Sequence, residues 1–190
     1  MKKFLILLFL PIIFGFTTSE YNDKSIILHF QNIVNQYRTS KNLGEISIDE
    51  SIKPLTDERS RDIIVNYNHL EDEKLKEKVK SLPLKFTFAG ENIAKVRNIP
   101  SNKEPYYVKK YITTNECGDK IEEVRTDITN IMNKMAMGDA TNYDIALYCF
   151  LEWKYSKDHN DLLLDNKIKR FHLSYEKSET FYYFCFVALN

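Results

Sequence analysis

The chain has 190 residues with 27 basic and 27 acidic side chains, so its formal net charge is zero. A nucleic-acid partner would require a basic face, and this balance gives no indication of one. Aromatic residues make up 13% of the chain, which is typical of a packed domain and argues against a disordered one.

The N-terminus has the pattern of a signal peptide. Lys2 and Lys3 precede an apolar or neutral run from Phe4 to Phe16, and small residues follow as far as Ser19. A run of this length is too short to cross a hydrocarbon core of about 30 Å as a helix. We therefore expect residues 1–19 to be removed and residues 20–190 to form one secreted or extracytoplasmic domain without a membrane span. An uncleaved N-terminal anchor is the alternative.

The odd cysteine count means that at least one thiol is unpaired. Cys149 and Cys185 both lie in strongly apolar segments, where they are either small buried core residues or the two halves of one disulfide. Of these we favour the buried thiols. Cys117 lies beside Gly118 in a weakly patterned segment, and we expect it to be free.

In the first half of the chain, apolar spacing predicts two helices. The first runs from about residue 24 to 40, with the turn at Gly44 available for a left-handed conformation. The second runs from about residue 51 to 67 and places Pro54 in its first turn, where proline is tolerated. The charged run 71–80 favours a solvated helical face or loop. Residues 86–89 are expected to form a short strand.

The second half predicts an extended stretch over 106–114, two further helices and a C-terminal hairpin. Asp119 and Glu122 have the spacing of a capping box for a helix that ends at Gly138. Another helix begins near Thr141 and carries Trp153. The final strand, residues 181–189, is apolar on both faces and must be covered on both sides. This pattern predicts a helix–sheet–helix sandwich.

Three motifs in chain order resemble the CAP superfamily (cysteine-rich secretory protein, antigen 5 and pathogenesis-related 1), also called the SCP domain. The first is Asn35-Gln36-Tyr37-Arg38, similar to the family's N-x-x-R helix, followed by a helix that ends at His69. The second, Ala89-Gly90-Glu91-Asn92-Ile93-Ala94, contains the family's GENIA signature. The third, Trp153-x-x-Ser156-x-x-His159, resembles an element of the compact bacterial members.

This resemblance implies an α+β fold, a three-layer α–β–α sandwich with a mainly antiparallel central sheet. It also implies a cleft that gathers His69, Glu91 and His159. In many eukaryotic members a second Glu stands where this chain has Ser156, so the full tetrad is absent. Residues 95–144 form a longer segment than compact members have, and we interpret it as an insertion.

Glu152 could supply the missing carboxylate. If one helix continues through His159, Glu152, Ser156 and His159 lie on one face at i, i+4 and i+7. If Ser156 is instead the N-cap of a new turn, that geometry fails.

The residues implied for the cleft have the ligand chemistry of a metal site. Two imidazoles and one carboxylate suit Zn²⁺ or another divalent cation, with His69, Glu91 and His159 as the ligands. The favoured hypothesis is a secreted binding module for a metal, a small or lipid ligand, or an extracellular protein. The alternative is a metal-dependent hydrolase with Glu91 as general base. A third hypothesis is an interaction domain whose cleft is vestigial.

Overall fold

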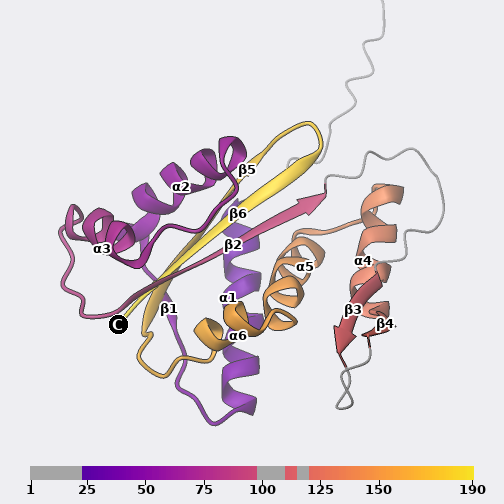
Figure 1. Cartoon of the computed structure of the whole chain (residues 1–190), viewed down its shortest axis with the longest axis horizontal. Coiled ribbons are helices and arrows are strands. Elements are labelled where there is room, and N and C mark those ends of the chain that lie inside the picture. Colours follow the sequence, from indigo (N-terminus) through magenta and orange to yellow (C-terminus); the bar gives the residue numbers. More distant parts are fainter. Residues whose placement is uncertain (1–22, 98–109, 115–119) are drawn as a thin grey trace, which may run out of the picture.

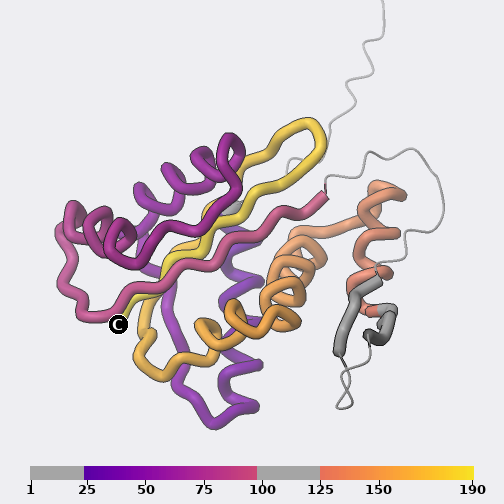
Figure 2. The backbone as a smooth tube through the Cα atoms, viewed as in Figure 1, coloured from indigo at the N-terminus to yellow at the C-terminus, as the bar shows by residue number. Residues whose placement is uncertain are grey.

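The computed structural model describes residues 23–97, 110–114 and 120–190, and it places one four-stranded sheet between two layers of helices (Figure 1). Buried side chains form two separate clusters, one on each face of this sheet. The expected α+β three-layer sandwich is therefore confirmed. The tube in Figure 2 shows the long C-terminal hairpin running through the middle of these layers.

The sheet has the strand order β1-β5-β6-β2. Strands β5 (Arg170–Lys177) and β6 (Phe181–Leu189) form the predicted hairpin, and β2 (Ala89–Arg97) pairs antiparallel with β6. The short strand β1 (Ser47–Ile48) pairs parallel with β5, so the sheet is mixed. Its three long strands have the expected antiparallel arrangement.

One face of the sheet is covered by α1 (Asp23–Ser40) and α5 (Asn142–Lys154), with the short α6 (Lys157–Leu163) beside β2. Helix α4 (Thr126–Met137) packs against α5. The inward stripe of α1 is the one that the apolar spacing predicts, and Phe30 and Val34 are fully buried on it. Trp153 of α5 is 1% exposed and packs edge-on against Phe30. Removal of this apolar surface from water stabilises the layer.

The other face is covered by η1 (Glu50–Ile52), α2 (Lys53–Val65) and α3 (Asp72–Lys80). Pro54 lies in the first turn of α2, as predicted. The buried side of α2 is unusual, because it carries Thr56, Arg59 and Ser60 besides its apolar residues. Buried polar groups destabilise a fold unless they are hydrogen-bonded. The hydrogen-bond partners of these three side chains are therefore needed for α2 to pack on this face.

Four local expectations are wrong. The helix expected to end at His69 is α2, which ends at Val65, so His69 lies in the loop after it. After α1 the left-handed residue is Asn42, with φ 59°, and not Gly44. The strand expected over 86–89 begins only at Ala89, because β6 pairs with β2 from that residue onward. Glu122 lies in strand β4 (Lys120–Val124) and not in a capping box, and α4 begins after it at Thr126.

The segment interpreted as an insertion contains the end of β2, a β3–β4 pair and α4. Strand β3 (Lys110–Thr114) pairs antiparallel with β4 in a sheet of its own, which agrees with the part of the predicted extended stretch that is described. Gly138 ends α4 with φ 78°, as its position predicts. Within the described residues, no helix has both the length and the hydropathy of a membrane span.

Candidate functional site

His69, Glu91 and His159 lie together although they come from three separate parts of the chain. His69 lies in the loop between α2 and α3, Glu91 on β2 and His159 on α6. The two Nε2 atoms of the histidines are 3.0 Å apart, and His69 Nδ1 is 3.4 Å from Glu91 Oε2. The structure therefore brings together the three residues that the motif resemblance places in one cleft.

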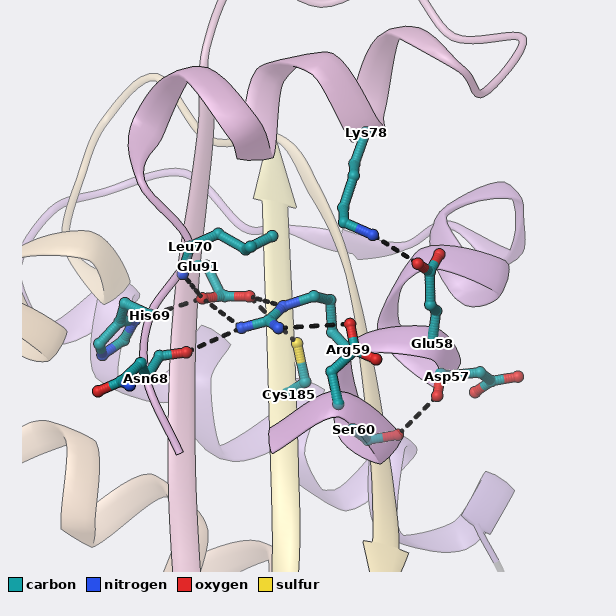
Figure 3. A network of polar contacts seen from close by, with 11 residues as sticks. Asp57, Glu58, Arg59, Ser60, Asn68, His69, Leu70, Lys78, Glu91 and Cys185 are labelled. Atoms are coloured by element: carbon teal, nitrogen blue, oxygen red, sulfur yellow. Dashed lines mark hydrogen bonds and ion pairs between the residues drawn. The ribbon is translucent and has the colours of Figure 1, made fainter. Parts of the chain in front are cut away.

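Glu91 is the buried end of this chain of contacts, with a side chain only 2% exposed. Its carboxylate accepts hydrogen bonds from Arg59 Nε at 2.7 Å and from the backbone N–H of Leu70 at 3.0 Å (Figure 3). Burial raises the pKa of this carboxyl, but the hydrogen bonds from His69, Arg59 and Leu70 outweigh burial and hold the pKa below its usual range. Glu91 is therefore ionised at neutral pH.

Arg59 is the site residue that the sequence analysis missed. Its side chain is 5% exposed, and its guanidinium also donates to the backbone carbonyl of Asn68 at 3.0 Å (Figure 3). The Arg59–Glu91 pair thus fixes both sides of the loop residue His69. A signal was present: Arg59 stands four residues after Leu55 and four before Ile63, on the inward stripe of the predicted helix.

The contacts of Glu91 determine the tautomer of His69. A carboxylate only accepts hydrogen bonds, so His69 Nδ1 carries the proton and Nε2 presents its lone pair toward His159. His159 Nε2 then donates across the 3.0 Å gap. Burial and the neighbouring His69 lower the pKa of His159, which favours its neutral imidazole. His69 is 45% exposed, which leaves the pair open to solvent.

Helix α6 is held in place by contacts from three directions, and these contacts set the position of His159. Asn92 Nδ2 donates to the carbonyl of His159 at 3.0 Å. Arg38, from the N-x-x-R motif, donates to the carbonyl of Leu163 at 2.8 Å. A Cβ atom at Gly90 would lie 2.4 Å from a methyl group of Leu162, so glycine permits α6 to approach β2 this closely.

The proposed face of Glu152, Ser156 and His159 does not exist, because α5 ends at Lys154 and α6 begins at Lys157. Ser156 is the N-cap residue of α6, as its alternative interpretation states, although its side chain accepts no capping hydrogen bond. Glu152 instead lies near Tyr67. Burial raises the pKa of Tyr67 to about 12, and the charges of Cys149 and Glu152 add to the shift.

A metal held between the two Nε2 atoms would require His159 to carry its proton on Nδ1 instead of donating it from Nε2 to His69. Within the described part of the chain, no group of three or more His, Cys, Asp or Glu side chains has a ligand arrangement. Two nitrogens on one tetrahedral Zn²⁺ lie about 3.3 Å apart, given Zn–N distances of about 2.0–2.1 Å. The two Nε2 atoms are 3.0 Å apart. Glu91 contacts the opposite nitrogen of His69, where a carboxylate orients a ligating imidazole.

Cys149 and Cys185 are both free and buried, which confirms the interpretation as core thiols. They belong to the two clusters on opposite faces of the sheet. Burial raises the pKa of each thiol well above its usual range, so both are unreactive. Cys117 lies outside the described residues.

Comparison with known proteins gives distant structural similarity. No protein-family model matches the sequence, and no curated protein matches it. A solved structure of an extracellular protein containing an SCP domain, from Bacillus anthracis str. Ames, is 15% identical over 87% of this chain with a TM-score of 0.49. The matched region spans 41% of that protein's chain.

Proposed function

We propose that the chain is a secreted CAP-like binding module whose cleft holds a divalent metal ion between His69 and His159. The observation that carries this proposal is the 3.0 Å separation of the two Nε2 atoms on an open face. Glu91 serves as the carboxylate that orients His69, and Arg59 keeps Glu91 ionised and in place. The CAP resemblance of the three motifs supports the same residues.

A metal at this pair would retain positions for a further ligand. Two protein nitrogens leave the other coordination positions of Zn²⁺ to water or to an atom of the bound partner. We propose that this open position is where a small ligand or an extracellular protein binds. The family that the motifs resemble includes lipid-binding members. The proposed site itself favours a ligand that carries a metal-coordinating group.

The hydrolase alternative is disfavoured by the state of Glu91. A general base must reach the proton that it removes and must be free to accept it. Here Arg59 and the Leu70 N–H occupy the carboxylate, and its pKa is held low. The site geometry therefore supports binding rather than metal-assisted hydrolysis.

Calorimetric titration of the apo protein with Zn²⁺ tests the proposal. At pH 7.5 we expect one ion per chain, and replacement of either His69 or His159 by Ala should remove most of the affinity. Glu91→Gln should weaken binding by about 10- to 100-fold, the usual effect of losing an orienting partner. Below about pH 6 binding should fall steeply, because both imidazoles must be neutral and their ordinary pKa is about 6.5.

Two matched variants provide controls for this titration. His29→Ala removes a histidine of α1 that packs edge-on against Tyr143, and Glu152→Gln changes a carboxylate of α5; both should bind as the unaltered chain does. Equal uptake of Zn²⁺ by the wild type and the His69→Ala/His159→Ala double variant would contradict the site. The vestigial-cleft hypothesis would then replace it.

A further inference from the structure

A second group of polar side chains, three of them buried, joins α2 to β5, away from the histidine pair. We call Thr56, Asp57, His172 and Ser174 the α2–β5 cluster. Thr56 Oγ1 is 2.8 Å from both His172 Nδ1 and Ser174 Oγ, and Ser174 Oγ donates to Asp57 Oδ1. The His172 side chain is 5% exposed.

The hydrogen bonds of the cluster form a directed chain that ends at a carboxylate. Asp57 accepts from Lys53 as well as from Ser174, and these bonds outweigh burial and lower its pKa. Since the Ser174 hydroxyl proton points to Asp57, Ser174 can only accept in its contact with Thr56. The Thr56 hydroxyl also donates to the backbone carbonyl of Lys53 at 3.1 Å, so its one proton is directed to one of these two oxygens. In this arrangement Thr56 accepts from His172 Nδ1–H. The neutral imidazole with its proton on Nδ1 therefore completes the chain.

His172 also lines a small cavity. The cavity has a volume of about 70 Å³ and is lined by apolar side chains of α1 together with charged groups, among them Lys24 from α1. Nε2 lies 3.7 Å from Glu50 Oε2, beyond hydrogen-bond distance, and the Glu50 side chain is 72% exposed. Of the other charged groups around the ring, Lys53 and Asp57 pair with each other, and Asp49 pairs with Arg170 of β5.

A proton added at Nε2 would therefore enter a poorly compensated site. It would create a buried charge whose nearest acceptor is an exposed, screened carboxylate. Burial lowers the pKa of His172, and the charge of Lys53 lowers it further against the opposing effect of Glu50, Asp57 and Asp49. The structure is thus complementary to the neutral ring, and a charged ring is accommodated less well between α2 and β5.

Helix α2 connects this cluster to the candidate metal site. Thr56 contacts β5, and Arg59, three residues later on the same buried side, holds Glu91 and the loop at His69. We propose that the α2–β5 cluster is an acid-operated switch, in which protonation of His172 loosens α2 from the sheet and thereby disorders the histidine pair at the cleft. The predicted effect on metal binding rests on the proposed function, whereas the predicted loosening of α2 is independent of it.

The direction of the effect follows from the lowered pKa. Between the folded pKa and the ordinary value of about 6.5, the released state of His172 binds more protons than the packed state does. Packing of α2 is therefore complete above about pH 6.5 and weakens as pH falls through this window. Each pH unit within the window changes the equilibrium between packed and loosened α2 by up to about tenfold.

Hydrogen–deuterium exchange of the metal-free protein between pH 7.5 and 5 tests the switch. Protection factors, which correct for the intrinsic pH dependence of exchange, are compared for residues 53–65 of α2 and residues 142–154 of α5. In the wild type we expect protection of α2 to fall with acid by up to about tenfold per pH unit below about pH 6.5, while protection of α5 stays constant. The His172→Asn variant keeps a polar group near the Nδ1 position but cannot be protonated, and its α2 protection should not change with pH.

The His69→Ala/His159→Ala double variant separates this proposal from the metal site. It cannot hold the metal, yet its α2 protection should still fall with acid as in the wild type. Equal pH responses of α2 and α5, or a wild-type response in His172→Asn, would overturn the switch. If the double variant alone loses the response, the proton sensor is the cleft pair and the proposal is wrong.

A direct titration keeps the proposal testable if His172→Asn fails to fold. The imidazole Cε1–H signals of the wild-type protein report each histidine by NMR. We expect the His172 signal to titrate below the ordinary value of about 6.5, together with the loss of α2 protection. A His172 signal that titrates at or above that value would refute the switch.

Discussion

Replacement of Arg59 by Met should lower the free energy of unfolding by about 3–5 kcal/mol, because it leaves the Glu91 carboxylate buried without its partner. The two side chains are 5% and 2% exposed, and the Arg59 Nε–Glu91 Oε1 distance is 2.7 Å. Methionine retains much of the aliphatic volume, so the loss is electrostatic rather than a cavity effect. Urea denaturation at pH 7.5 measures it.

The double variant Arg59→Met/Glu91→Gln is the matched control for this loss. It removes both charges and should recover a large part of the stability, since a neutral amide is easier to bury than an unpaired carboxylate. In Arg59→Met alone, burial should raise the pKa of Glu91, so the deficit relative to wild type should shrink as pH falls toward 4. A deficit that is independent of pH and equal in both variants would show that the ion pair is not the cause.

Trp153→Ala should destabilise the protein by about 3–5 kcal/mol, the usual range for truncation of a buried large aromatic side chain. Trp153 is 1% exposed, packs against Phe30 and Phe186, and donates from its indole nitrogen to the carbonyl of Ile93 at 2.9 Å. Alanine would leave a cavity between α1, α5 and the sheet. Denaturant melts measure the effect, and a loss below about 1 kcal/mol would contradict this packing.

Trp153→Phe separates the hydrogen bond from the volume. It keeps an aromatic ring in contact with Phe30 but removes the indole N–H, which leaves the Ile93 carbonyl on the outer edge of β2 without this donor. The expected loss is smaller, about 1–3 kcal/mol. Equal losses in the Ala and Phe variants would assign the whole effect to the hydrogen bond.

The sandwich architecture could be predicted from the sequence because it depends on apolar periodicity. The apolar stripe of α1 and the strand β6, which is apolar on both faces, show which surfaces must be buried. Folding removes such surfaces from water, so their pattern predicts the layers. The capping-box pattern at Asp119 and Glu122 failed because a local signal competes with strand pairing, and the pairing of β4 with β3 decides the conformation of Glu122. Helix propensity and capping patterns are weak predictors of conformation where strand pairing is available.

The site was only partly predictable for a different reason. The motif positions indicated His69, Glu91 and His159, but nothing in their spacing shows that Arg59 occupies the Glu91 carboxylate. That contact joins α2 to β2 across 32 residues, and only tertiary packing creates it. The same is true of His172, whose partners Thr56 and Asp57 lie more than 100 residues earlier in the chain. The Glu152 hypothesis failed because α5 and α6 are separate helices. Ser156, a residue type that favours the N-cap position, was the local sequence signal for this break.

The strand order also determines when the protein can fold. The two inner strands, β5 and β6, are the last strands of the chain, whereas their outer neighbours β1 and β2 are made more than 70 residues earlier. Neither early strand has a partner until the C-terminal hairpin exists, so the core cannot close progressively during synthesis. Pairings of such high sequence separation form slowly. The nascent chain should therefore remain without its native sheet until the final hairpin emerges.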